Sequence, residues 1–171
     1  AWWALDFPFM GRYTPKQVAR RPDLARRDIE ATRRACEKFR SLPVAIMNFV
    51  EGTRFTAAKH ATLGSPYRHL LKPKSGGVAF VLDAMDDGLH AILDVSIVYP
   101  AGTPSLLDLL ADRIPEVRVR IRQREIPTAL LGGDYQADRA FRARFQQWMN
   151  SVWEQKDTDI AAMLAAEHVR A

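Results

Sequence analysis

A short polar run, Glu51-Gly52-Thr53-Arg54, follows a long apolar stretch and carries residue types that bind phosphate. The guanidinium of Arg54 offers a planar fork of N–H donors that matches two phosphate oxygens, and the carboxylate of Glu51 can orient that arginine. Gly52 permits a positive φ or the close approach of a ligand to the backbone. The run predicts an anion-binding turn, and the alternative is an ordinary strand-end turn with a surface ion pair.

A second candidate anion site is formed by Lys74 and Ser75, which precede an apolar helix predicted over Val78–Met85. The N-terminus of a helix presents free N–H groups and a partial positive charge, and both attract anions. The alternative is a helix cap that binds no ligand.

An apolar run at residues 44–50 leads into the first candidate site. Nearly continuous apolar sequence is typical of a strand that is buried on both faces, as in a parallel sheet. Ligands of open α/β sheets bind beyond the carboxyl ends of the strands, which is where Glu51 to Arg54 would then lie. A loop is predicted from residue 55 to Lys74.

The other elements follow from hydrophobic periodicity. We expect further helices at about residues 15–21, 23–42, 106–112 and 134–165, and strands at 89–99 and 117–124. This alternation predicts an α/β fold, a single domain with a mixed, mostly parallel sheet flanked by helices. The 171 residues, 47% of them hydrophobic, suffice for one domain with a core.

Arginines and aromatic residues each leave alternatives open. The arginines at 118, 120, 122 and 124 share one face of a predicted strand, either solvated and ion-paired or in contact with acidic lipid headgroups. The aromatic residues at 2, 3, 7 and 9 could form core, pack on an upstream segment, or anchor the chain at a membrane interface.

The overall composition limits the partners. The net charge of +5 favours anionic ones, namely phosphates, nucleic acid or an acidic membrane surface, without choosing among them. The single cysteine, Cys36, can form no internal disulfide and has no clustered partners for a metal, so we expect no metal site. No apolar run reaches the roughly 18 residues of a membrane span.

Phe49–Arg54 resembles the third sequence motif of the glycerolipid acyltransferases, which include lysophosphatidic acid and glycerol-3-phosphate acyltransferases. That family usually has Phe-Pro-Glu-Gly-Thr-Arg. Val50 in place of the proline is similar to the lysocardiolipin and lysophosphatidylinositol branch and to related bacterial membrane enzymes.

Three other segments resemble family motifs in the same order. Phe9, Met10 and Arg12 are similar to the later positions of the second motif, although Asp6 replaces its glycine. Residues 72–77 resemble a lysine- and glycine-containing stretch, and residues 97–100 resemble the fourth motif, an apolar strand ending in proline.

The resemblance implies a glycerol-3-phosphate acyltransferase-like fold and transfer of an acyl chain to a lysophospholipid such as lysophosphatidic acid. Acyl-CoA or acyl carrier protein would be the donor, and no further cofactor is implied. Arg12 and Arg54 would hold the acceptor phosphate, with Glu51, Gly52 and Thr53 shaping the loop. The protein would act on an anionic membrane surface, at the cytoplasmic face of a bacterial inner membrane.

The first motif of the family, Asn-His followed after four residues by Asp, has no counterpart here. Its histidine would be the general base and its aspartate would orient that base. None of the four histidines has Asp five residues later: His60, His69, His90 and His168. We therefore expect the catalytic pair and a membrane anchor upstream of Ala1. Residues 1–171 would then be the C-terminal portion of one acyltransferase domain, inactive by itself.

Two other hypotheses stay open. A basic nucleic-acid-binding module is supported weakly by the arginine content, but no recognition motif accompanies it. A catalytically inactive core that still binds phosphate or lipid is compatible with the acyltransferase hypothesis.

Overall fold

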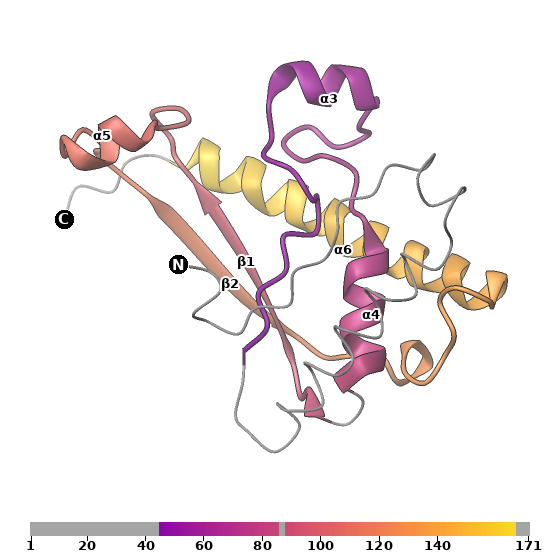
Figure 1. The fold of residues 1–171 in the computed structure, drawn as a ribbon. Coiled ribbons are helices and arrows are strands. Elements are labelled where there is room, and N and C mark those ends of the chain that lie inside the picture. Colours follow the sequence, from indigo (N-terminus) through magenta and orange to yellow (C-terminus); the bar gives the residue numbers. More distant parts are fainter. Residues whose placement is uncertain (1–44, 86–87, 167–171) are drawn as a thin grey trace.

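A computed structural model of the protein describes residues 45–85 and 88–166 (Figure 1). Predictions on residues 1–44, including Arg12, Cys36 and two helices, lie outside the described residues. The described elements are α3 (Ala57–Leu63), α4 (Ser75–Met85), β1 (Ile92–Val98), α5 (Leu106–Leu110), β2 (Arg118–Arg124), the 3-10 helix η3 (Thr128–Leu130) and α6 (Arg139–Ala165).

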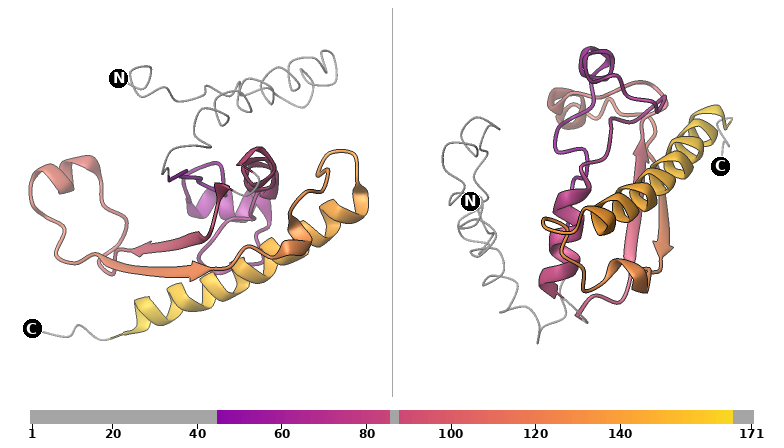
Figure 2. Two further views of the ribbon diagram at one scale, coloured as in Figure 1. Left: turned by 90° about the horizontal axis from the view of Figure 1, so that it is seen from below. Right: turned by 90° about the vertical axis from the view of Figure 1, so that its right-hand side faces the viewer.

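β1 and β2 form a two-stranded antiparallel hairpin with Val95 opposite Ile121. Both strands were predicted, at 89–99 and 117–124. Figure 1 shows the hairpin extending from the body of the molecule, with α5 at its outer end and α6 running beside it. Figure 2 gives two further views of this arrangement.

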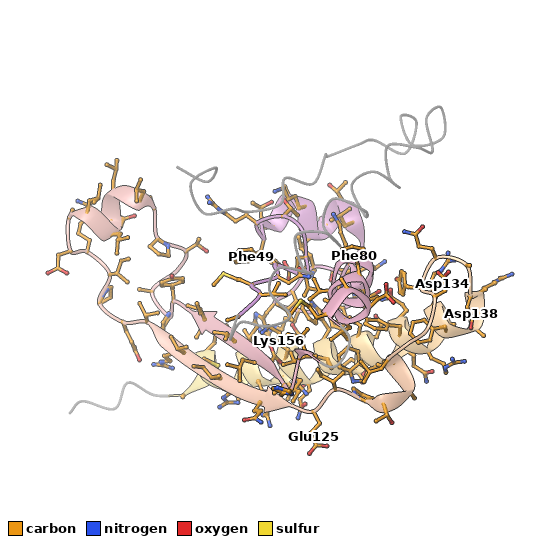
Figure 3. All side chains as sticks on the ribbon, turned by 60° about the horizontal axis from the view of Figure 1, so that its bottom comes forward. Phe49, Phe80, Glu125, Asp134, Asp138 and Lys156 are labelled. Carbon is orange, nitrogen blue, oxygen red and sulfur yellow. The ribbon has the colours of Figure 1, made fainter. Side chains whose placement is uncertain are left out.

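The core lies between α6, α4 and η3. Phe145 of α6 is fully buried, and Phe141, Val152 and Trp153 are buried along the same helix. α6 begins where the side chain of Asp138 accepts hydrogen bonds from two backbone N–H groups of the first turn, which caps the helix. Figure 3 shows Asp138 at the outer edge of the molecule. No described helix is both long and apolar enough to cross a membrane.

The predicted strand at residues 44–50 is not found: residues 45–49 have no regular secondary structure and are exposed. A strand needs a neighbour to satisfy its backbone groups, and no strand of the described ranges pairs with this segment. The described sheet is antiparallel, and the mostly parallel sheet expected from the sequence stays a prediction.

Helix α3 lies where a loop was predicted. Thr56 caps its first turn, since the threonine side chain accepts a hydrogen bond from the backbone N–H of Lys59. Gly64 ends the helix with a left-handed backbone, φ 54°, a conformation that glycine adopts without steric cost. These two residues were the sequence signals for a seven-residue helix.

The hairpin has one covered and one exposed face. Val98 and Ser96 are buried, whereas the alternate residues Leu93, Val95 and Ile97 are exposed. The arginine face of β2 is ion-paired, as one of the two interpretations held. The bonds run from Arg120 and Arg122 to Asp159, from Arg124 to Asp94, and from Arg118 to Glu116.

Candidate functional site

The turn at residues 51–54 is joined to the chain segment that precedes α4. The backbone N–H of Lys74 donates to the carbonyl oxygen of Val50 at 2.9 Å, and Gly52 N donates to Phe49 O at 2.8 Å. The two candidate anion sites of the sequence, residues 51–54 and Lys74, therefore lie side by side in one place.

Gly52 has the positive φ that the sequence suggested for it. Its φ is +67°, in the left-handed region that L side chains rarely adopt. A Cβ on this residue would lie 3.1 Å from Lys74 Nζ, so the side chain of Lys74 is folded closely over the turn. Any larger residue would strain the backbone and displace that ammonium group.

Glu51 points inward and fixes the turn to the body. Its Oε1 accepts a hydrogen bond from the backbone N–H of Leu71 at 3.1 Å. Burial raises the pKa of Glu51 above its ordinary value, and the Leu71 N–H, the charge of Lys156 and the Trp153 side chain oppose this rise. The sequence suggested that Glu51 orients Arg54. In the structure the Glu51 carboxylate instead accepts a hydrogen bond from the backbone N–H of Leu71.

Lys59 of α3 is a site residue that the sequence reasoning missed. Its Nζ lies 2.7 Å from Thr53 Oγ1 and 3.1 Å from the carbonyl oxygen of Arg54. The ammonium therefore donates to two consecutive residues of the turn. It was missed because a loop was predicted here, and the Thr56 cap was the signal that could have placed Lys59 on a helix beside the turn.

The outer side of the turn is exposed and positively charged. Thr53, Arg54 and Lys74 are exposed, and so are Lys59 and Lys72. From Gly52 to Leu82 the chain contains no Asp or Glu and five basic residues, which are Arg54, Lys59, Arg68, Lys72 and Lys74. This excess of basic residues along the stretch favours an anionic ligand such as phosphate.

Ser75 is used inside the protein. It is the first residue of α4, only 1% exposed, and its hydroxyl hydrogen-bonds to Tyr135 OH at 3.0 Å and to the side chain of Gln146. Anion binding beside α4 therefore rests on Lys74 and stays a prediction.

The described histidines form no pair with an aspartate. His60 Nε2 lies 2.6 Å from the carbonyl oxygen of Tyr67. The carboxylate of Asp94, four residues after His90, instead binds Lys156 at 2.5 Å and Arg124 at 2.9 Å. Within residues 45–85 and 88–166, no group of three or more His, Cys, Asp or Glu side chains is placed to hold a metal ion.

Comparison with known proteins finds a similar sequence, an acyltransferase. The chain is 24% identical over 139 residues to lysocardiolipin acyltransferase 1 of Mus musculus, an alignment that covers 73% of this chain and 34% of that protein. The chain thus spans about a third of the length of the curated relative it matches. No family model matches the chain. No solved structure matches it either. The similarity indicates a distant relationship to an acyltransferase.

Proposed function

We propose that this chain belongs to an acyltransferase that moves a fatty acyl chain from acyl-CoA or acyl carrier protein to a lysophospholipid such as lysophosphatidic acid. Its residues 51–54 would hold the acceptor phosphate at a membrane surface. The observation that carries the proposal is a turn that is pinned inward by Glu51, braced by Lys59 and Lys74, and exposes Arg54. The relationship to an acyltransferase supports it.

Each group of the turn has a part in binding. The Arg54 guanidinium can donate two parallel N–H bonds to a phosphate, a charge-assisted arrangement of high specificity. Thr53 Oγ1 accepts from Lys59, so the hydroxyl proton of Thr53 is left to donate to a phosphate oxygen. Lys74 Nζ adds a further positive charge beside Gly52.

The reaction needs a general base. In the family this base is a histidine with an aspartate five residues later, and no histidine of this chain has that aspartate. The acceptor hydroxyl oxygen attacks the thioester carbonyl carbon while a histidine removes the hydroxyl proton. The carbon–sulfur bond then breaks, and the sulfur leaves and takes up a proton. The turn contributes by holding the phosphate, which fixes the acceptor hydroxyl in position for attack. Arg12 would assist at the same phosphate.

Acyl transfer by the full-length protein tests the proposal, with Arg54→Ala compared to Arg139→Ala. Arg139 is an exposed arginine at the first position of α6, outside the turn. We expect Arg54→Ala to raise the acceptor KM about tenfold or more, the effect of losing a charge-assisted contact. Equal kinetics for the two variants would overturn the phosphate assignment.

The nucleic-acid hypothesis gains no support from the basic strand. All four arginines of β2 are engaged in ion pairs, with Asp94, Glu116 and Asp159 as partners. Phosphate binding by this strand would have to break those pairs. Binding to duplex DNA that weakens with salt would reopen the hypothesis.

A further inference from the structure

α3 and α5 differ from the other described helices in having no buried residue. In α5, four leucines are therefore exposed to solvent. Leu106, Leu107, Leu109 and Leu110 are 70%, 70%, 62% and 74% exposed. A contiguous apolar patch of this kind is unusual on a soluble monomer and marks a surface that meets another apolar phase.

α5 bonds several of its polar groups within its own segment, which lowers the cost of bringing it to a lipid surface. Ser105 and Asp108 form a capping box, in which the Ser105 side chain accepts from Asp108 N and Asp108 Oδ2 accepts from Ser105 N. Arg113 donates to Asp108 Oδ1 at 2.9 Å and its backbone N–H donates to Asp108 O at 2.8 Å. The one acidic residue inside the helix is thus neutralised locally.

α3 and α5 both lie on the upper side of the molecule in Figure 1, α5 at the outer end of the hairpin and α3 over the body. α3 adds exposed apolar groups, with Phe55 just before it 40% exposed and Leu63 50% exposed. It also adds charge, because it lies inside the stretch from Gly52 to Leu82 that has five basic and no acidic residues. Basic residues near an anionic lipid surface each contribute about 1 kcal/mol of attraction.

From this combination we propose that α5 and α3 dock the protein on an anionic phospholipid bilayer. The leucines of α5 enter the interfacial region, and Lys59 and Arg54 meet the headgroups. The inference rests on the proposed function, since it would place the turn at residues 51–54 beside the headgroup of a membrane-borne acceptor. It moves lipid contact away from the arginines of β2, which are engaged with α6 and with neighbouring acids.

Flotation with vesicles tests the proposal independently of catalysis. The 171-residue chain is mixed with phosphatidylcholine vesicles that contain or lack 30% phosphatidylglycerol, a chosen composition of about one anionic lipid in three. The vesicles hold no lysophospholipid and no acyl donor, so failure of the acyltransferase proposal leaves the readout intact. The test variant is Leu107→Ser/Leu110→Ser, and the matched control is Leu93→Ser, an equally exposed leucine on the hairpin.

We expect the chain to float with the anionic vesicles and more weakly with the neutral ones. The double variant should bind the vesicles at least about tenfold more weakly than the unaltered chain, because two inserted leucines are lost. Leu93→Ser should bind as the unaltered chain does. Absence of vesicle binding by the unaltered chain would overturn the proposal. So would equal losses in the double variant and the control, or a lipid-free dimer that the double variant abolishes, which would assign α5 to a second copy of the chain.

Discussion

The two faces of the β1–β2 hairpin reverse the usual distribution of residues. The face toward α6 carries buried polar groups beside the core residue Val98: Asp94 is bonded to Lys156 and Arg124, and both the lysine and the aspartate are largely buried. Figure 3 shows Lys156 near the centre of the molecule. The opposite face is apolar and exposed, with Leu93, Val95, Ile97, Val119 and Ile121 between 44% and 63% exposed.

This contrast shows that α6 packs on the face whose charged residues find bonding partners on that helix, although the other face is the more apolar one. Buried charges are stable only when each finds an opposite charge or a hydrogen bond, and α6 supplies these through Lys156, Asp159 and Gln155. The apolar face has no described element packed on it. Substitutions on the two faces should therefore differ sharply in cost.

The largest effect is expected at Asp94. Asp94→Ala leaves Lys156, which is 9% exposed, without its carboxylate, and should lower the free energy of unfolding by about 3–5 kcal/mol. Asp83→Ala, which removes an exposed carboxylate from α4, should cost under ~0.5 kcal/mol. Urea unfolding of both variants measures the difference, and similar costs would contradict the account of the covered face.

Glu51 is the next buried polar anchor. Glu51→Ala leaves the Leu71 N–H without its acceptor and should cost about 1–3 kcal/mol, whereas Glu51→Gln keeps an oxygen there and should cost less. Because burial raises the pKa of Glu51, its protonated form is favoured in the folded state. Its contribution is therefore full below the ordinary pKa and is lost as pH rises through the raised one.

Glu51→Gln removes this ionisation, so the advantage of the unaltered chain over this variant should shrink as pH rises above the ordinary glutamate pKa of about 4.3. Unfolding free energies measured from acid to neutral pH check the sign. A growing advantage of the unaltered chain with rising pH would show that Glu51 is stabilised as an anion.

A pair of substitutions on one strand compares the two faces directly. Val98→Thr buries a hydroxyl at a 6% exposed position and should cost about 1–3 kcal/mol. Val95→Thr, three residues earlier on the exposed face, should change the free energy of unfolding by less than ~0.5 kcal/mol. If Val95→Thr proved as costly as Val98→Thr in thermal unfolding, the apolar face would be covered in solution.

The smallest effect concerns Asp159, which pairs with Arg120 and Arg122. Burial acts to raise its pKa, but the two arginines outweigh it and the pKa is lowered overall. Asp159 therefore stabilises the fold above its ordinary pKa, and this contribution is lost as pH falls through the lowered value. The pair is partly exposed, so Asp159→Asn should cost no more than about 1 kcal/mol at pH 7.

The difference between Asp159→Asn and the unaltered chain should shrink as pH falls below the ordinary aspartate pKa of about 3.9, because protonation removes the charge that the two arginines stabilise. Acid titration of unfolding in the two proteins measures it. A constant difference down to pH 2 would mean that the ion pairs contribute nothing.

Periodicity predicted α4, α6 and both strands of the hairpin. α4, α6 and β1 bury part of their residues, and the alternation of arginines with apolar residues indicated β2. Periodicity failed at residues 45–49, where an apolar run was taken for a buried strand. Apolar content shows that a segment can be buried, but pairing depends on a neighbour that the run itself does not encode. It failed also at α3, which has no buried face and is specified only by its caps.

The sequence identified most residues of the candidate site, but it did not reveal the contacts between them. Gly52 could be predicted because a positive φ and close approach both require glycine. That Lys74 folds over Gly52, and that Lys59 bonds Thr53, depends on two segments meeting, which residue spacing does not reveal. Glu51 was assigned a surface role because its local neighbour is an arginine, whereas its partner is Leu71, twenty residues away.

The most direct test of the phosphate site is isothermal titration of the chain with glycerol 3-phosphate, which carries the acceptor phosphate without an acyl chain. We predict measurable binding that falls about tenfold or more in Arg54→Ala and is unchanged in Arg139→Ala. Absence of binding, or equal affinities in Arg54→Ala and the unaltered chain, would contradict the assignment of residues 51–54 as the acceptor phosphate site.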